Sequence, residues 1–163
     1  MKPFEISRVV DVPRDRVWQA WTELEQFKQW FGPKGFAMAY SKLDLRPGGM
    51  LHYRLEGPGG VQVWGKALYK EIAKPERLVW INSFSDKDGG TTVHPMNPAW
   101  PREMHTTVTF EAQGAKKTKI TVRWLPVEGA SEAELKTFNE GRASMNQGWS
   151  GTFEQFTGYL AAA

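Results

Sequence analysis

Between Phe36 and Leu125, apolar and polar residues alternate in short runs separated by sequences typical of turns. Side chains of a β-strand point to opposite faces in turn, so the alternation predicts strands with one buried face. The sequences RPGG at 46–49 and EGPGG at 56–60 join neighbouring runs and suit tight turns. The pattern predicts an antiparallel meander of about six strands.

The chain before this meander predicts one more strand and two short helices. Residues 4–11 have a strand pattern, and Pro13 and Asp15 are typical of a helix beginning. Apolar residues then recur at helical spacing until Gly32 and Pro33 end the pattern. With the first strand, the predicted sheet has about seven strands.

A long helix is predicted after Pro126. Ser131 and Glu134 have the spacing of a capping box, which satisfies free backbone N–H groups in the first helical turn. The apolar residues that follow lie on one stripe of this helix: Leu135, Phe138, Met145, Trp149, Phe153, Phe156 and Leu160. The concave face of the sheet is the large apolar surface that can cover this stripe. The predicted fold is α+β, a curved antiparallel sheet wrapped around a long C-terminal helix.

Length and aromatic content suggest what this fold encloses. The 163 residues are enough for a single domain, 1–163, with one core. They include 8 Trp, 9 Phe and 4 Tyr. Rigid rings surround a cavity more readily than they fill one, and an aromatic-lined concavity is the usual form of a small-molecule site.

Charge and cysteine content exclude several classes of function. The formal net charge is +3, but the basic residues are scattered among acidic ones, so we expect no nucleic-acid partner. No apolar run is long enough to span a bilayer, and the first residues lack the apolar segment of a secretion signal, so we expect no membrane association. The absence of cysteine excludes thiol chemistry and fits a cytoplasmic protein.

Four segments carry a family resemblance: VDVPRDRVWQAWTELEQFKQWFGP at 10–33, DLRPGG at 44–49, PERLVW at 75–80 and SMNQGWSGTFEQFTGYL at 144–160. Together with the order of elements, they resemble the helix-grip fold of the START and birch-pollen-allergen (SRPBCC) superfamily. They are most similar to the branch that contains the C-terminal domain of the activator of the heat-shock chaperone ATPase. The resemblance covers nearly the whole chain. It implies a deep cavity between sheet and long helix, which in this superfamily commonly holds apolar or aromatic small molecules.

Nine residues are candidates for the lining of such a cavity: Trp30, Tyr53, Trp80, Phe84, Trp100, Met104, Arg142, Met145 and Trp149. The phase of the strand over residues 79–84 is ambiguous, so Trp80 and Phe84 fit either face of the sheet. Arg142 interrupts the apolar stripe, where a guanidinium is costly unless it is paired. It either faces the cavity and holds an anionic ligand, or reaches a structural partner at the rim.

The stretch 88–105 is too long for a hairpin turn and is stiffened by Pro95, Pro98 and Pro101. We interpret it as a rim or lid element whose Trp100 caps the cavity. The alternative is an irregular loop whose Trp100 seals the edge of the sheet.

Metal and cofactor sites are not predicted. His52 and His105 are expected on the outer face of the sheet, and His94 has no partner at a metal-binding spacing. No nucleophile motif or phosphate-binding loop occurs, so no catalytic residue or cofactor can be named.

Four glycines of the predicted helix, Gly141, Gly148, Gly151 and Gly158, are expected on a flank that does not face the cavity. Each costs about 1 kcal/mol relative to alanine in a helix. The hypotheses are close approach of another backbone on this flank, from this chain or a second subunit, or a kink near residues 147–151.

Three functions are compatible with these features of the sequence. The leading hypothesis is binding of a small apolar or aromatic molecule between the sheet and the long helix. The second is a cyclase, dehydratase or hydrolase in the same cavity, with Arg142 stabilising a developing oxyanion. The third is a co-chaperone or other interaction module that contacts a chaperone, and a homodimer is left open as a further partner.

Overall fold

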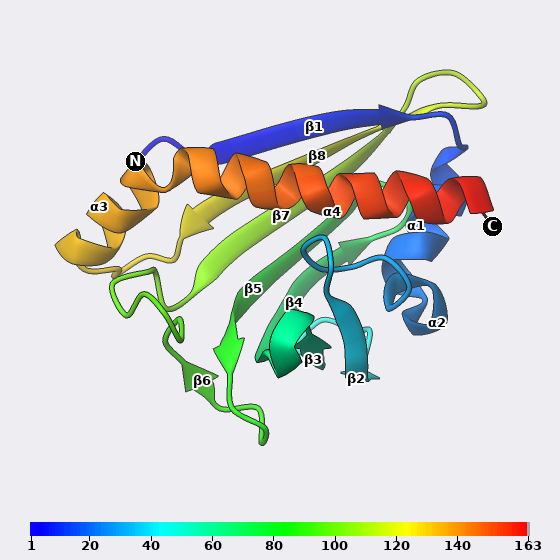
Figure 1. Ribbon diagram of the computed structural model, residues 1–163. Helices are drawn as coiled ribbons and strands as arrows, with labels where there is room; N and C mark the ends of the chain where they lie inside the picture. Colours follow the sequence, from blue (N-terminus) through cyan, green and yellow to red (C-terminus); the bar gives the residue numbers. More distant parts are fainter. Residues whose placement is uncertain (163) are drawn as a thin grey trace.

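The computed structural model describes residues 1–162, which form one antiparallel sheet and four α-helices (Figure 1). The strands are β1 (Phe4–Val10), β2 (Ala37–Leu43), β3 (Met50–Glu56), β4 (Gln62–Ala73), β5 (Arg77–Ser85), β6 (Thr91–Thr92), β7 (Met104–Ala112) and β8 (Thr118–Pro126). The helices are α1 (Arg14–Thr22), α2 (Leu24–Phe27), α3 (Glu132–Glu140) and α4 (Arg142–Ala162), and a short 3-10 turn spans Pro58–Gly60.

The strands are ordered β1-β8-β7-β5-β4-β3-β2, which is the predicted meander with the first strand added beside the last. The two-residue strand β6 pairs with β5 and makes the sheet eight-stranded. It lies within the stretch 88–105, where the sequence predicted no strand. The α+β prediction is confirmed, because α4 runs along the concave face of the curved sheet (Figure 1).

Strand register determines which side chains face α4. Leu51 of β3 lies on the inner face and is buried, whereas the next residue, His52, lies on the outer face as predicted. His52 is nevertheless only 7% exposed, because Tyr40 and Trp64 cover its ring. Its Nε2 lies 3.1 Å from the carbonyl oxygen of Asp86. This arrangement gives His52 a structural role on the outer face.

A packed aromatic cluster forms the core at the C-terminal end of α4. Trp21 of α1 is at its centre, with its ring centroid 4.8 Å from that of Trp30, 5.6 Å from Phe110 and 6.0 Å from Phe156. These side chains are almost fully buried. Tilted and edge-on pairs of this kind add to the stabilisation from burial. This end of the molecule is therefore filled by its own side chains.

The predicted long C-terminal helix is divided into α3 and α4 at Gly141. The capping box is present, since the Ser131 hydroxyl accepts from the Glu134 N–H and the Glu134 carboxylate accepts from the Ser131 N–H. Gly141 ends α3 with φ −90° and ψ 10°.

The helices of residues 1–162 include none with the length and hydropathy of a membrane-spanning segment.

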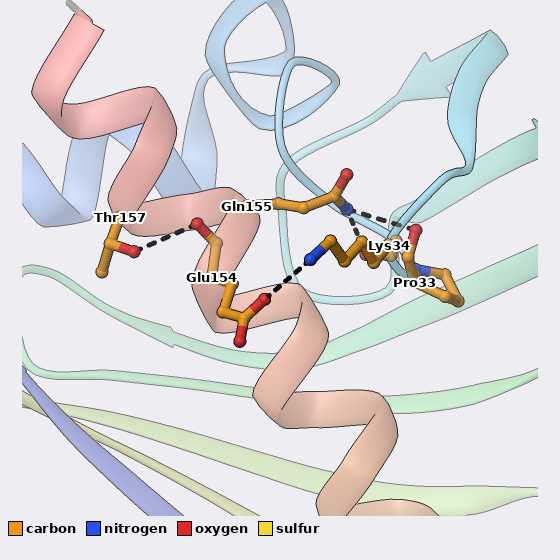
Figure 2. Close-up of polar contacts among 6 residues, drawn as sticks. Pro33, Lys34, Glu154, Gln155 and Thr157 are labelled. Carbon is orange, nitrogen blue, oxygen red and sulfur yellow. Dashed lines mark hydrogen bonds and ion pairs between the residues drawn. The ribbon is translucent and has the colours of Figure 1, made fainter.

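The middle of α4 is attached to the loop between α2 and β2. Gln155 donates from Nε2 to the carbonyl oxygens of Gly32 at 2.6 Å and Pro33 at 3.3 Å, and Lys34 pairs with Glu154 at 3.5 Å. Figure 2 shows Gln155 and Glu154 reaching this loop from the same side of the helix. These contacts hold α4 over the sheet, and two of the loop residues involved, Gly32 and Pro33, border the space between the helix and the sheet.

Candidate ligand cavity

Between the first half of α4 and the concave face of the sheet lies a cavity of about 860 Å³, within the range of about 300–1,000 Å³ that is usual for small-molecule sites. The concave faces of β3, β4 and β5 form one wall. Residues 94–97 and 100–101, part of the predicted lid, form another. We call residues 94–101 the lid segment.

One face of the α3–α4 unit lines the cavity with residues spaced three or four apart. The large members are Met145 and Trp149, and the small ones are Gly141, Ser144 and Gly148. The expectation that the glycines do not face the cavity is therefore wrong for Gly141 and Gly148. Gly148 is also exposed, and a Cβ at this position would have no heavy atom within 4 Å. The cavity is thus open to solvent along this edge of the helix.

The other two glycines differ from each other. A Cβ on Gly151 would lie 3.6 Å from Cβ of Lys34, so the α2–β2 loop approaches the helix at ordinary contact distance. Gly158 has nothing within 4 Å. Close approach within the chain therefore occurs at Gly151 but not at Gly148 or Gly158, and α4 continues through residues 147–151 without the alternative kink.

The structure places most of the predicted lining residues around this cavity: Tyr53, Trp80, Phe84, Trp100, Met104, Met145 and Trp149. The pairing of β5 with β4 and β7 determines which residues of 79–84 face the cavity. Trp80 pairs with Tyr69 and Thr106, and Phe84 pairs with Gly65, all on the concave face. A role of these residues in holding a ligand stays a prediction.

Trp30 does not line the cavity and is a correction to the predicted set. It lies in the packed aromatic end, where its Nε1 donates to the carbonyl oxygen of Ala20 at 3.0 Å. Its ring centroid is 4.5 Å from that of Phe156. Trp30 borders instead a separate hollow of about 340 Å³ beside β2. Helical spacing placed it on the buried face of its segment but did not distinguish the two ends of the core.

Arg142 is a second correction, because its guanidinium points to the start of the chain rather than into the cavity. It donates to the carbonyl oxygens of Pro3, at 3.1 Å, and Lys2, and its Nε donates to Asn139 Oδ1 at 3.2 Å. Its Cζ lies 5.2 Å from the centroid of the Phe138 ring. Arg142 is the first residue of α4, directly after the break at Gly141, so it is not in the interior of one continuous helix as the sequence predicted. The structural alternative is the one observed.

Trp100 borders the cavity and packs against the α3–α4 junction. Its ring centroid is 6.5 Å from that of Phe138, and a Cβ on Gly141 would lie only 2.9 Å from Trp100 Cζ3. The absence of a side chain at Gly141 therefore makes room for this indole. Trp100 thus borders the cavity, and its role as a cap over a ligand stays a prediction.

Further contacts hold the lid segment and the chain that follows it. The backbone N–H of Arg102 donates to Glu134 at 2.7 Å, which attaches the chain to the first turn of α3. His94 Nδ1 accepts from the backbone N–H groups of Met96 and Asn97 at 3.0 and 3.1 Å, and its ring lies 4.7 Å from that of Phe84. Burial lowers the pKa of His94. With Nδ1 as acceptor, the neutral ring carries its proton on Nε2.

Tyr69 and Asn82 are among the polar residues of the cavity wall that sequence reasoning missed. Both alternate in phase with predicted lining residues, since Tyr69 pairs with Trp80 and Asn82 lies between Trp80 and Phe84 on β5. That alternation is the signal that could have found them. Burial raises the pKa of the Tyr53 hydroxyl to about 12 and also raises the pKa of Tyr69, so both hydroxyls are neutral near pH 7.

Within residues 1–162, no three histidine, aspartate or glutamate side chains gather as a metal-binding group. The lining is instead mostly aromatic and aliphatic. The arrangement can exclude water from a flat apolar molecule and offer it a few neutral hydrogen-bonding groups.

An antiparallel sheet that grips a long C-terminal helix around an apolar cavity defines a helix-grip protein. The chain belongs to the family described as "Activator of Hsp90 ATPase homolog 1-like protein", whose model matches residues 11–161. No curated relative matches the sequence.

Solved structures from several bacteria share the fold. A protein from Arthrobacter aurescens is 25% identical with a TM-score of 0.80, and the match covers 99% of this chain and 87% of that one. A protein from Nitrosomonas europaea is 23% identical with a TM-score of 0.75, covering 98% and 94%. The AHSA1 protein from Silicibacter pomeroyi is 15% identical with a TM-score of 0.74, covering 99% of each chain.

Proposed function

We propose that this protein binds a small, apolar, ring-containing molecule in the cavity between α4 and the concave face of the sheet. The observation that carries this proposal is a cavity of about 860 Å³ lined by aromatic residues from the sheet, the helix and the lid segment. Its rings include Tyr53, Trp80, Trp100 and Trp149. Burying apolar ligand surface is worth about 25 cal/mol per Å² before the costs of association.

Binding is favoured over turnover by the chemistry of the lining. Glu140 borders the cavity but is exposed and lies 3.9 Å from Lys136. His94 is held neutral with Nδ1 already accepting two hydrogen bonds, which leaves Nε2–H as a donor and not as a base. Arg142, the candidate for oxyanion stabilisation, is engaged with Lys2 and Pro3. The cyclase, dehydratase or hydrolase alternative therefore loses the group on which it depended.

A co-chaperone role has the family description as its support. It predicts that the Hsp90 ATPase rate rises when the protein is added, whether or not the cavity is filled. The binding proposal predicts no dependence on a chaperone, so ligand binding by the purified protein alone tests this proposal, and the ATPase rate tests the co-chaperone role.

The test uses N-phenyl-naphthylamine, a neutral aromatic probe whose fluorescence rises in apolar surroundings. We expect one probe per chain, with quenching of tryptophan emission. The variant Gly148→Leu adds a side chain at the open edge of the cavity, and should weaken probe affinity by about tenfold or more, equivalent to about 1.4 kcal/mol. The substitution also removes a helical glycine, so folding should not suffer.

The matched control is Gly158→Leu. Gly158 lies on the same helix, is exposed and has open space around it, but it does not line the cavity. Its probe affinity should equal that of the wild type. Equal binding by both variants would show that the probe does not occupy this cavity, and the absence of binding by the wild type would remove the proposal itself.

A further inference from the structure

The polar groups of the cavity wall gather on the concave faces of β3, β4 and β5. Tyr53 extends from β3 across Gly65 of β4, where a Cβ would lie 2.5 Å from the tyrosine hydroxyl oxygen. Gly65 therefore allows the Tyr53 ring to lie over β4 on the side toward β5. Asn82 of β5 pairs with Ala67, two residues beyond Gly65 on the same face. The hydroxyl and the carboxamide are thus diagonal neighbours on one wall.

The orientation of the Asn82 carboxamide is set by the residue behind it. Thr106 is fully buried and donates its hydroxyl to Asn82 Oδ1 at 2.5 Å. With Oδ1 engaged, Nδ2 is the group that Asn82 can present as a donor. Within residues 1–162, neither this Nδ2 nor the hydroxyls of Tyr53 and Tyr69 has a hydrogen-bond partner. None of these three atoms is among the buried polar atoms that lack a hydrogen-bond partner, so each keeps some contact with solvent. They are available to a molecule in the cavity.

The same cavity offers no positive charge. Of its described lining residues, only Glu140 carries a formal charge near pH 7, and that charge is negative. Arg142, the basic residue that begins α4, binds the backbone carbonyls of Pro3 and Lys2, which do not line the cavity. A buried carboxylate without a cationic partner pays its desolvation cost without compensation. The raised pKa of Tyr53 reflects the same penalty on negative charge at this wall.

We infer that the cavity selects an uncharged aromatic ligand bearing a carbonyl oxygen, which accepts hydrogen bonds from Asn82 Nδ2 and the Tyr53 hydroxyl, and rejects the corresponding carboxylate. The inference rests on the proposed binding function and deepens it by naming the chemical class of ligand. Each neutral hydrogen bond contributes about 0.5–1.5 kcal/mol net, so two such bonds correspond to roughly a tenfold gain in affinity.

Three two-ring probes of similar size test the selection by isothermal titration at pH 7: diphenylmethane, benzophenone and diphenylacetate. Benzophenone carries the carbonyl, diphenylmethane lacks it, and diphenylacetate carries a carboxylate. We expect benzophenone to bind about tenfold more tightly than diphenylmethane, and diphenylacetate to bind most weakly of the three. Equal affinities would leave the cavity as a binding site but overturn the selection. Tight binding of diphenylacetate would also overturn it, and no binding by any probe would count against the proposed function.

Tyr53→Phe removes only the hydroxyl and keeps the ring. It should lower benzophenone affinity about threefold to tenfold and leave diphenylmethane affinity unchanged. Tyr159→Phe is the control, because its hydroxyl donates to Gln26 outside the cavity at 3.2 Å. An equal loss for both probes in Tyr53→Phe would assign Tyr53 to packing alone. The selection among the three probes in the wild type provides a test that does not depend on any variant folding.

Discussion

Three glycines of the α3–α4 unit, Gly141, Gly148 and Gly151, have different structural roles, which their spacing in the sequence does not reveal. Gly141 leaves room for Trp100, Gly148 keeps part of the cavity open, and Gly151 allows the α2–β2 loop to approach. A glycine within a helix costs about 1 kcal/mol relative to alanine. Gly148 and Gly151 lie within α4 and carry this cost, whereas Gly141 is the cap that ends α3, so the three positions should respond differently to substitution.

Gly141→Ala should destabilise the protein by about 1–2 kcal/mol, because the new Cβ would lie 2.9 Å from Trp100 and 3.1 Å from the Thr137 carbonyl oxygen. Gly148→Ala should instead stabilise it by up to about 1 kcal/mol, since the added methyl group meets no atom. Urea denaturation followed by circular dichroism measures both changes. Equal stability of the two variants would contradict the assignment of Gly141 as the position that accommodates Trp100.

At the level of elements, the chain that follows the lid segment is anchored to α3 through a single carboxylate. Glu134 accepts from the backbone N–H of Ser131 at 3.0 Å as part of the capping box, and from the N–H of Arg102 at 2.7 Å. These hydrogen bonds lower the pKa of Glu134, with the bond from Arg102 as the largest cause. One side chain therefore links the cap of α3 to the chain that directly follows the lid segment.

The lowered pKa gives this anchor a defined pH dependence. The folded pKa lies below the ordinary glutamate value of about 4.3, so the stabilisation is complete above that value and is lost as pH falls through the folded pKa. Between about pH 6 and about pH 3, wild-type protein should lose more stability in urea than Glu134→Gln, which cannot titrate. Glu132→Gln, an exposed substitution in the same turn, should keep the wild-type dependence. Identical pH profiles for the wild type and Glu134→Gln would contradict the role of the ionised anchor.

At the level of the whole molecule, the space between sheet and helix is divided into two parts. Toward the C-terminal end of α4 it is filled by Trp21, Trp30, Phe110 and Phe156, whereas toward the N-terminal end it remains open as the cavity. The packed part can fix the orientation of α4 without the help of a ligand. Arg142 adds a second attachment at the other end of the helix, where it holds the backbone of Lys2 and Pro3.

Arg142→Met should therefore lower global stability without changing the affinity of a neutral ligand. The loss should be about 1–2 kcal/mol, because charged hydrogen bonds to two carbonyls are removed while the stem still packs on Phe138. Arg123→Met is the control: this exposed arginine makes one ion pair with Glu5 at 3.8 Å and should change stability by less than about 0.5 kcal/mol. Urea denaturation and benzophenone titration measure the two effects. Weaker ligand binding by Arg142→Met would restore Arg142 to the site.

Local patterns determined the elements and their order. Alternation with a period of two fixed six strands of the meander, helical spacing fixed α1 and α2, and Ser131 with Glu134 marked the start of α3. These features depend on neighbouring residues in the chain, so they are legible in the sequence. The faces of Met104, Met145 and Trp149 followed from the same periodicities.

Tertiary structure alone decided which buried residues face a cavity and which face one another. Trp30 and Trp149 are both tryptophans at apolar positions of predicted helical segments. Trp30 nevertheless packs against Phe156, whereas Trp149 borders the cavity. The register between β4 and β5 determined the faces of Trp80 and Phe84. The contacts of Arg142 with Lys2 and Pro3, at the other end of the chain, determined where its guanidinium points. Periodicity distinguishes the inside from the outside of an element, but the shape of the inside depends on contacts between residues that lie far apart in the chain.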